Sequence, residues 1–434
     1  MILDGVRVIE FSIAWAGPLA GRFLGDLGAE VIKVEHPTSR GGHLPDDPSL
    51  RESDGIDDWT WGTLPGPIFR PGIFPDAEPG EQPWNRSGAF NKMNRNKRSL
   101  CIDLKLPGGR EIFERLVATS DVVLNNYSPR GVRSLGIDYE SLAAINPSII
   151  AVSMSGFGAT GPDQGRVSWG PMLEAQSGLA ATTGYSDRGP LKMGAALPDP
   201  MGGVHGALAV LAALSERDRT GQGMNVDVSQ LEAYACVGGE IYLAASLTGG
   251  APARRGNRSL EHAPQGVYPC AGEDAWIAIT AASDEEWATL VSVIGDDSLA
   301  DPELGSVAAR FDRHDELDKA IGAWTCGQDK FALTHRLQQA GVTAFASMTN
   351  QDIVEDAHLA ARGFMVEWDQ PAVGVRRYPG FPIHFSALPP VPMRPCPDLG
   401  QDNHYVLGEV LGDSPETIAQ LEHDGVIADA PPPL

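Results

Sequence analysis

Residues 6–35, VRVIEFSIAWAGPLAGRFLGDLGAEVIKVE, decide the fold class of this chain. Residues 6–11 form a short apolar run that predicts a buried strand, and residues 18–27 begin with proline and have helical spacing. Residues 30–35 predict a second strand. Strand, helix and strand in this order make a βαβ unit, which joins two parallel strands of one sheet. The chain is therefore predicted to be an α/β protein.

A βαβ unit is also the start of many dinucleotide sites, with Glu35 in the place of the acid that grips a ribose. The turn at residues 12–21, SIAWAGPLAG, however, has no GxGxxG pattern. Its bulky Trp15 stands where the backbone would have to approach a pyrophosphate. A nicotinamide site is therefore disfavoured.

The alternation of strands and helices continues after residue 99. Helices are predicted at residues 108–119 and 139–145, and strands at 121–125 and 148–154. One mostly parallel sheet with helices on both faces, a Rossmann-like domain, is the economical architecture. Residues 38–90, rich in Gly, Pro, Asp and Trp, predict a long surface insertion or flap.

The chain is predicted to divide into three segments. Residues 1–225 supply the N-terminal part of a large domain. Residues 226–349 form a linker and a smaller α/β domain, and residues 350–434, rich in proline, return to the large domain.

Composition excludes several classes of partner. The 434 residues carry a formal net charge of −24, whereas nucleic acids and anionic membranes bind basic surfaces. The five cysteines are scattered and lack CxxC spacing, so we expect neither disulfides nor a metal site. No signal peptide and no run of 18 apolar residues is present, which predicts a cytoplasmic protein without a membrane partner. Local basic runs occur at residues 94–98, NRNKR, and at Arg254 and Arg255.

The stretch 191–216, LKMGAALPDPMGGVHGALAVLAALSE, places one carboxylate, Asp199, at the start of an apolar helix. Pro200 suits the first helical position and Asp199 suits the N-cap, so a purely structural cap is one interpretation. The other is that a carboxylate at a helix N-terminus stays ionised and acts as a nucleophile, with Gly202 and Gly203 leaving room for a ligand. Position alone does not choose between these interpretations.

Six collinear blocks resemble the class III CoA-transferases, the family of formyl-CoA transferase and of bacterial carnitine and bile-acid CoA-transferases. Besides the opening segment and the stretch around Asp199, they include NRNKRSLCIDLKLPGG, NNYSPRGVRSLGIDYESLAAINPSIIAVSMSGFGATGP, SGLAATTGYSDRGP and ERDRTGQGMNVDVSQLEA. The resemblance implies two protomers threaded through each other as interlocked rings, forming a homodimer or a heteromer with a homologue.

The resemblance also implies a chemical role for Asp199. In the family's transferases the matching Asp attacks an acyl-CoA thioester to give an acyl-aspartyl anhydride, CoA returns to form an aspartyl-CoA thioester, and a carboxylic acid acceptor finally takes the CoA. No cofactor is implied beyond coenzyme A and acyl-CoA as substrates. The residues that fall where the family contacts CoA, or in a block close to that site, are Ala14, His36, Lys97, Arg98, Ile102, Asn126, Tyr127 and Arg133.

Two positions depart from formyl-CoA transferase. Trp15 replaces a glutamine near the reactive acid and Trp169 replaces a tyrosine, and both changes enlarge the apolar surface beside the acyl group. We therefore expect an acid larger than oxalate or formate.

Alternative functions on the same fold stay open from the sequence. Acyl-CoA racemases use a His and an Asp, and the His would fall at Trp169, which transfers no proton. A CoA-thioester lyase and a non-catalytic subunit of a heteromeric transferase are further alternatives, although the presence of Asp199 disfavours the latter.

Overall fold

The computed structural model describes residues 1–40 and 74–432. Most of the predicted insertion at 38–90 therefore lies outside the described residues. The chain divides into two compact units. Unit 1 comprises residues 1–179, 193–242 and 359–434, and unit 2 comprises residues 180–192 and 243–358.

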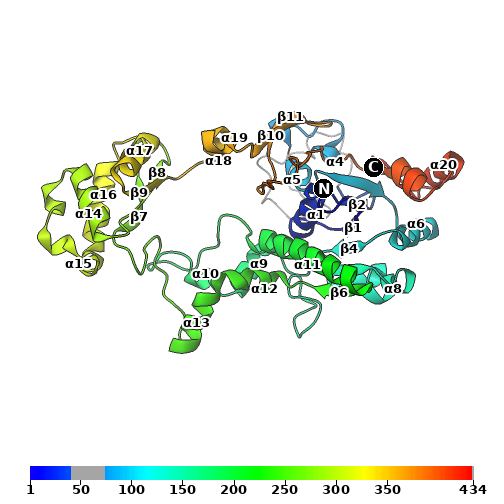
Figure 1. Ribbon diagram of the computed structural model, residues 1–434, viewed down its shortest axis with the longest axis horizontal. Coiled ribbons are helices and arrows are strands. Elements are labelled where there is room, and N and C mark those ends of the chain that lie inside the picture. Colours follow the sequence, from blue (N-terminus) through cyan, green and yellow to red (C-terminus); the bar gives the residue numbers. More distant parts are fainter. Residues whose placement is uncertain (41–73, 433–434) are drawn as a thin grey trace, which may run out of the picture. The chain divides into compact units, whose positions relative to one another are not determined.

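A six-stranded parallel sheet organises unit 1, with the strand order β3-β2-β1-β4-β5-β6 (Figure 1). β1 pairs with β2 on one side and with β4 on the other, so the order reverses between β1 and β4. The predicted βαβ unit and the predicted parallel α/β sheet are confirmed. The strands are β1 (Arg7–Phe11), β2 (Glu30–Glu35), β3 (Lys97–Cys101), β4 (Val122–Asn125), β5 (Ile150–Ser153) and β6 (Met224–Asp227).

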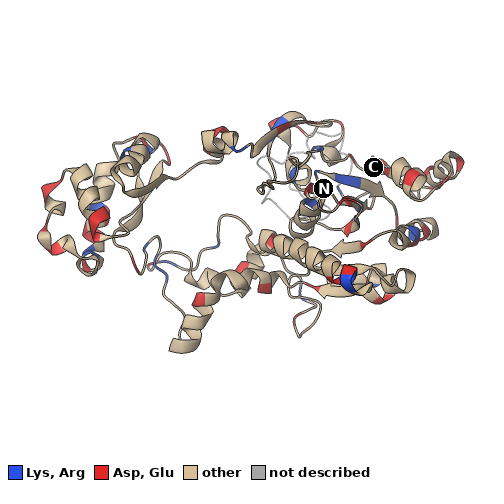
Figure 2. Cartoon of the chain, in the orientation of Figure 1, with Lys and Arg blue, Asp and Glu red and all other residues tan. Residues whose placement is uncertain are grey.

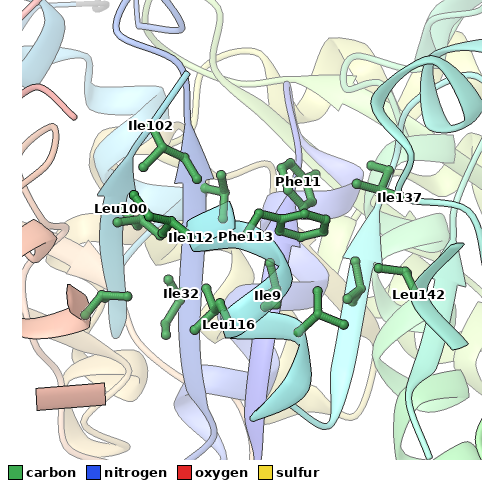
Figure 3. Close-up of a cluster of buried hydrophobic side chains, with 14 of the residues drawn as sticks. Ile9, Phe11, Ile32, Leu100, Ile102, Ile112, Phe113, Leu116, Ile137 and Leu142 are labelled. Atoms are coloured by element: carbon green, nitrogen blue, oxygen red, sulfur yellow. The ribbon is translucent and has the colours of Figure 1, made fainter. Parts of the chain in front are cut away.

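Each face of this sheet has its own core, because successive strand residues point to opposite faces. On one face, Ile9 and Phe11 of β1 pack with Phe113 and Leu116 of α6 (Figure 3). On the other, Val8 packs with residues of α1 and α11. The helices of unit 1 are α1 (Ala16–Asp26), α4 (Pro83–Arg86), α5 (Gly88–Met93), α6 (Pro107–Ala118), α7 (Pro129–Leu135), α8 (Tyr139–Ile145), α9 (Gly170–Gln176), α11 (Pro198–Thr220), α12 (Gln230–Ala235) and α20 (Pro415–His423).

The C-terminal segment of the chain completes unit 1. A hairpin of β10 (Met365–Gln370) and β11 (Gly374–Pro379) stacks Trp368 on Tyr378 with ring centroids 4.1 Å apart. Further on, Val406 and Ile418 enter the same core as Phe113. The N-terminal and C-terminal parts of the chain thus share one hydrophobic core.

Unit 2 has a separate core built on an antiparallel sheet of order β7-β8-β9. Its apolar residues come mainly from the middle strand and from three helices, including Trp287, Leu317 and Leu333. The elements are β7 (Gln265–Pro269), β8 (Trp276–Thr280), β9 (Thr343–Ala346), α14 (Asp284–Ile294), α15 (Val307–Asp312), α16 (His314–Thr325), α17 (Lys330–Ala340) and α18 (Asn350–Glu355). Helix α13 (Gly239–Thr248) joins the two units in sequence.

Within the described residues, no helix is long and apolar enough to cross a membrane.

Candidate active site

The loops that follow β1 and β4 lie at the point where the strand order reverses. In open parallel sheets this point, at the carboxyl ends of the strands, is where ligands bind. Ala14 and Trp15 follow β1, and Asn126 and Tyr127 follow β4. Four of the predicted site residues therefore share this part of the sheet edge.

Asn126 holds the loop after β1 with both atoms of its amide. Its Oδ1 accepts from the N–H of Ile13 at 2.9 Å, and its Nδ2 donates to the carbonyl of Ile13 at 2.9 Å. Ala14, the next residue, has a φ of 59°, a left-handed conformation that costs a non-glycine residue about 1–2 kcal/mol. Trp15 then precedes α1, with Lys92 Nζ 5.4 Å from its ring centroid. Asn126 therefore stabilises a strained loop that carries two predicted site residues.

Helix α11 begins two residues earlier than the sequence predicts. Leu197 is its N-cap and Pro198 its first residue, so Asp199 occupies the second helical position. The prediction that Asp199 caps the helix is wrong, because Pro198 already provides the fixed φ that starts it. Asp199 does lie in the first turn, where a negative charge is favoured.

Asp199 packs directly against the first residue of α9. An ideal Cβ built on Gly170 would lie 2.0 Å from Oδ2 of Asp199 and 2.7 Å from Cβ of Ala196. Any side chain at position 170 would therefore displace the carboxylate or the backbone around it. Trp169, the predicted pocket residue, is the N-cap of the same helix and so lies next to this contact in the chain.

A second carboxylate, Glu174, lies one turn further along α9. It is 1% exposed, its Oε2 accepts from the N–H of Met193 at 3.2 Å, and its Oε1 accepts from the N–H of Leu197 at 3.3 Å. Burial, together with the negative charge of Glu174, raises the pKa of Asp199 to about 6. A perturbed carboxylate beside a second acidic group is typical of functional sites.

The predicted roles of Gly202 and Gly203 need correction. A Cβ on Gly202 would lie 2.7 Å from Cγ of Gln230, and one on Gly203 would lie 2.8 Å from the carbonyl oxygen of Ala16. Protein atoms therefore occupy the space beside these two glycines, which was predicted to be open to a ligand. The two glycines instead let α11 approach α12 and the start of α1, which brings the Trp15 loop to the turn after Asp199.

The buried face of α11 is made mainly of small residues. Small residues such as Gly206, Ala207 and Ala213 face the core, whereas Val204 is 45% exposed and Leu208 is 61% exposed. Close helix packing selects small side chains, so the positions of large apolar residues do not by themselves identify the buried face of this helix. Val204 and Leu208 are left on the surface of the single chain.

The basic run at residues 94–98 is largely internal. Arg95 is fully buried and makes two hydrogen bonds to Asp26. Lys97 is buried and donates to Glu10 Oε1 at 2.9 Å, and burial lowers its pKa to about 8. Arg98 pairs with Glu30 and Asp402. Figure 2 shows the basic colouring on β3, but carboxylates of unit 1 already neutralise these cations.

The remaining predicted CoA contacts, His36, Ile102 and Arg133, follow β2, β3 and β4 respectively. His36 follows β2 and is within 3.7 Å of Asp103, whereas Ile102 follows β3 and is 1% exposed within the core. Arg133 of α7 is exposed and lines a surface pocket. The other residues of that pocket are Leu104, Lys105, Arg110, Ser134, Leu135 and Gly136.

Gly170 and Glu174 are the site residues that the sequence did not reveal. The available signal was a single acidic residue within MLEAQSGL, between Leu173 and Leu179, both of which are buried. No cluster of His, Cys, Asp or Glu suited to a metal ion occurs among residues 1–40 and 74–432.

The chain is thus an α/β protein built on a parallel sheet. Its candidate site holds the carboxylate of Asp199, in the first turn of α11, against Gly170 of α9. The model of CoA-transferase family III matches residues 3–403, and the chain belongs to this family. It is a CoA-transferase.

Relatives support this assignment over nearly the whole length. The chain is 33% identical to the succinyl-CoA–D-citramalate CoA-transferase of Chloroflexus aurantiacus, with 98% of each chain covered. It is 32% identical to the succinate–glutarate CoA-transferase of Agrobacterium fabrum, covering 94% of this chain and 95% of the relative. A crystal structure of a CAIB/BAIF family protein from Brucella suis matches with a TM-score of 0.78 and 31% identity, covering 94% of this chain and 99% of that one.

Proposed function

We propose that Asp199 is the nucleophile of CoA transfer. The observation that carries the proposal is its placement: a half-buried carboxylate in the first turn of α11, packed against a glycine that leaves just enough space for it. Its raised pKa also strengthens it as a nucleophile compared with an ordinary aspartate, while leaving it mostly ionised at neutral pH.

The proposed chemistry proceeds through substitution at three carbonyl carbons, those of the donor, of Asp199 and of the acceptor. An oxygen of Asp199 attacks the thioester carbonyl, the C–S bond breaks and CoA leaves as the thiolate, which gives an acyl-aspartyl anhydride. The thiolate then attacks the aspartyl carbonyl, which releases the donor acid and leaves an aspartyl-CoA thioester. The acceptor carboxylate attacks the aspartyl carbonyl of this thioester, the C–S bond breaks, and an acceptor–aspartyl anhydride forms as the thiolate leaves. The thiolate then attacks the acceptor carbonyl of that anhydride, which gives the acceptor's CoA ester and releases Asp199 as the free carboxylate. A carboxylate nucleophile is needed because an anhydride conserves the energy of the thioester.

CoA is proposed to bind along the sheet edge, from the pocket of Lys105 and Arg133 toward the loops after β1 and β4. Arginine and lysine side chains there are suited to the phosphates of the nucleotide. Ala14, His36, Asn126 and Tyr127 follow strands at the same edge and are proposed to line the path of the pantetheine arm. Lys97 and Arg98 are not included in this surface, because protein carboxylates already engage them.

The proposed donor is the CoA ester of a dicarboxylic acid such as succinyl-CoA. The Chloroflexus aurantiacus relative is named for succinyl-CoA, and the Agrobacterium fabrum relative for succinate and glutarate. Trp15 and Trp169 favour an acceptor larger than oxalate, since indole rings add apolar surface beside the acyl group. The racemase alternative lacks its second proton-transfer group, because Trp169 occupies that position.

We propose further that two copies of the chain assemble. Helix α13 has no buried residue, yet Leu243 is 60% exposed and Leu247 is 78% exposed. In unit 1, Val204 and Leu208 of α11 are also exposed, and each of the two helices by itself presents apolar surface of the kind that a subunit interface covers. Sedimentation analysis of Leu208→Glu tests whether α11 contributes to a subunit interface. A shift toward monomer is expected, and an unchanged dimer would exclude the exposed face of α11 from the interface.

The cellular setting proposed for the enzyme is a reducing one such as the cytoplasm. All five cysteines are free thiols, and Cys101, Cys270 and Cys396 are buried.

Turnover with a panel of acids tests the proposed reaction. Succinyl-CoA is incubated with each acid, and the new CoA ester is measured for wild type, Asp199→Asn and Asp187→Asn. Asp187 is an exposed aspartate of unit 2 and serves as the matched control. We expect transfer to an acid larger than oxalate, its loss in Asp199→Asn and its retention in Asp187→Asn. Full transfer by Asp199→Asn would refute the proposed nucleophile.

A further inference from the structure

Helix α9 contacts the Asp199 segment at two points on one face. Gly170 and Glu174 are four residues apart, so they lie on the same side of the helix. Gly170 meets the carboxylate of Asp199, and Glu174 accepts hydrogen bonds from Met193 and Leu197. The segment that leads into α11 is therefore attached to α9 immediately before the nucleophile.

We propose that Glu174 is a positioning residue for Asp199, because its buried carboxylate anchors the backbone of residues 193–197 and thereby sets the place of the nucleophile. The inference rests on the proposed function, since it assigns Glu174 a role in the reaction of Asp199. Glu174 itself is not assigned a contact with substrate.

The hydrogen-bond pattern requires an acceptor at both ends of this side chain. An ionised carboxylate has two acceptor oxygens, and both are used here by backbone N–H groups. A glutamine of the same shape has one acceptor oxygen, and its NH₂ group would face the N–H of Met193 or of Leu197. Glu174→Gln therefore removes one anchor and adds a donor-to-donor contact, with almost no change in volume.

The charge of Glu174 adds a second, separable effect. After burial, it is the cause that raises the pKa of Asp199, so its removal is expected to lower that pKa. Other ionisable side chains also lie on the elements packed around Asp199. They are Arg22 and Asp26 of α1, His205 of α11, and Glu232 and Tyr234 of α12.

The test measures the single-turnover rate at which Asp199 is acylated by succinyl-CoA, between pH 5 and pH 8. Wild type is compared with Glu174→Gln and with Glu232→Gln, which removes the same charge from an exposed position of α12. For Glu174→Gln we expect a loss of about 10- to 100-fold at pH 7.5, as small displacements of reacting groups produce, and an acid limb moved to lower pH. Glu232→Gln is expected to match wild type in both measurements.

Two results would overturn the inference. One is a Glu174→Gln rate within twofold of wild type, and the other is a lower rate whose pH midpoint stays at the wild-type value, which indicates a structural role alone. If Glu174→Gln does not fold, Glu174→Asp replaces it: this variant keeps the charge and withdraws the oxygens by one methylene. It is expected to lose rate and retain the pH midpoint, and an unchanged rate would contradict the inference.

The same experiment separates this inference from the proposed function. If Asp199 of the wild-type enzyme is never acylated by any acyl-CoA, the proposed nucleophile is wrong. If wild type and Glu174→Gln are acylated equally, only the positioning role is wrong.

Discussion

A Cβ atom on Gly170 would lie 2.0 Å from Oδ2 of Asp199, so the carboxylate occupies the space that a side chain would need. We expect Gly170→Ala to displace Asp199 and to lower the rate of acyl transfer by about 100-fold, because a shift of about 1 Å has effects of this size. The measurement is single-turnover release of CoA from the acyl donor.

Gly165→Ala is the matched control for this substitution, since no heavy atom lies within 4 Å of a Cβ built there. It is expected to retain the wild-type rate. Equal rates for Gly170→Ala and Gly165→Ala would show that the carboxylate can move away from Gly170 without loss of function.

Asn126 is expected to act on substrate binding through the loop it holds. In Asn126→Asp the side chain no longer donates to the carbonyl of Ile13, which costs about 1–2 kcal/mol in unfolding free energy. The loop with Ala14 and Trp15 is then less well fixed, so the KM for acyl-CoA is expected to rise. Denaturant titration and steady-state kinetics measure the two effects.

Asn146→Asp separates stability from binding. The amide of Asn146 donates to the carbonyls of Val117 and Ser120, away from the strand-order reversal. Asn146→Asp is expected to lower the free energy of unfolding without raising the KM for acyl-CoA. A rise in KM of the same size in both variants would mean that Asn126 has no specific role in the site.

The acylation rate is expected to depend on the ionisation of Asp199. Its pKa of about 6 predicts a rate that is half-maximal near pH 6 and reaches a plateau above it, because only the carboxylate attacks. The contribution of Asp199 to the free energy of unfolding changes in the opposite direction: it decreases as pH rises. The folded-state pKa lies above the ordinary value of 3.8, so the stabilising effect of the protonated form is present below pH 4 and is lost as pH rises through 6.

Asp199→Asn tests the predicted pH dependence of the folding stability, because the amide does not titrate. Relative to Asp199→Asn, wild type is expected to become less stable between pH 4 and pH 7 by denaturant titration. A difference that stays constant across this range would contradict the raised pKa.

Arg95 is expected to be structural although it belongs to the basic run of the sequence. Arg95→Met leaves Asp26 buried without its main partner, which is expected to cost about 3 kcal/mol of unfolding free energy. Arg219→Met, at an exposed pair with Glu216, is expected to change stability little. Equal stability of the two variants would refute the buried ion pair, and urea denaturation provides the measurement.

The first half of the fold was predictable because its strands are apolar runs and its helices have clear start signals, such as Pro107 of α6, Pro129 of α7 and the N-cap Asp138 of α8. Residues 30–35 form β2 with the predicted bounds, and residues 139–145 form α8 as predicted. Burial on both faces of a parallel sheet produces such runs, so the local pattern carried the fold class.

Features that depend on close approach were not predictable in the same way. The core face of α11 consists mostly of Gly, Ala and Val, and although Leu214 belongs to it, Leu208 lies on the exposed side of the helix. The burial of Arg95 and Lys97 was not predicted, because their partners Asp26 and Glu10 are distant in sequence. The sequence suggested Asp199 as a candidate, whereas Gly170 and Glu174 become candidates only because α9 lies against the segment before α11.

The most direct test of the account is to trap the proposed intermediate. Wild-type enzyme is incubated with succinyl-CoA and then with hydroxylamine, and its peptides are examined by mass spectrometry beside those of Asp199→Ala. The account predicts a hydroxamate on Asp199 in the wild-type enzyme and none in the variant. Rapid transfer of CoA to an acceptor acid with no adduct at Asp199, or equal transfer by Asp199→Ala, would contradict it.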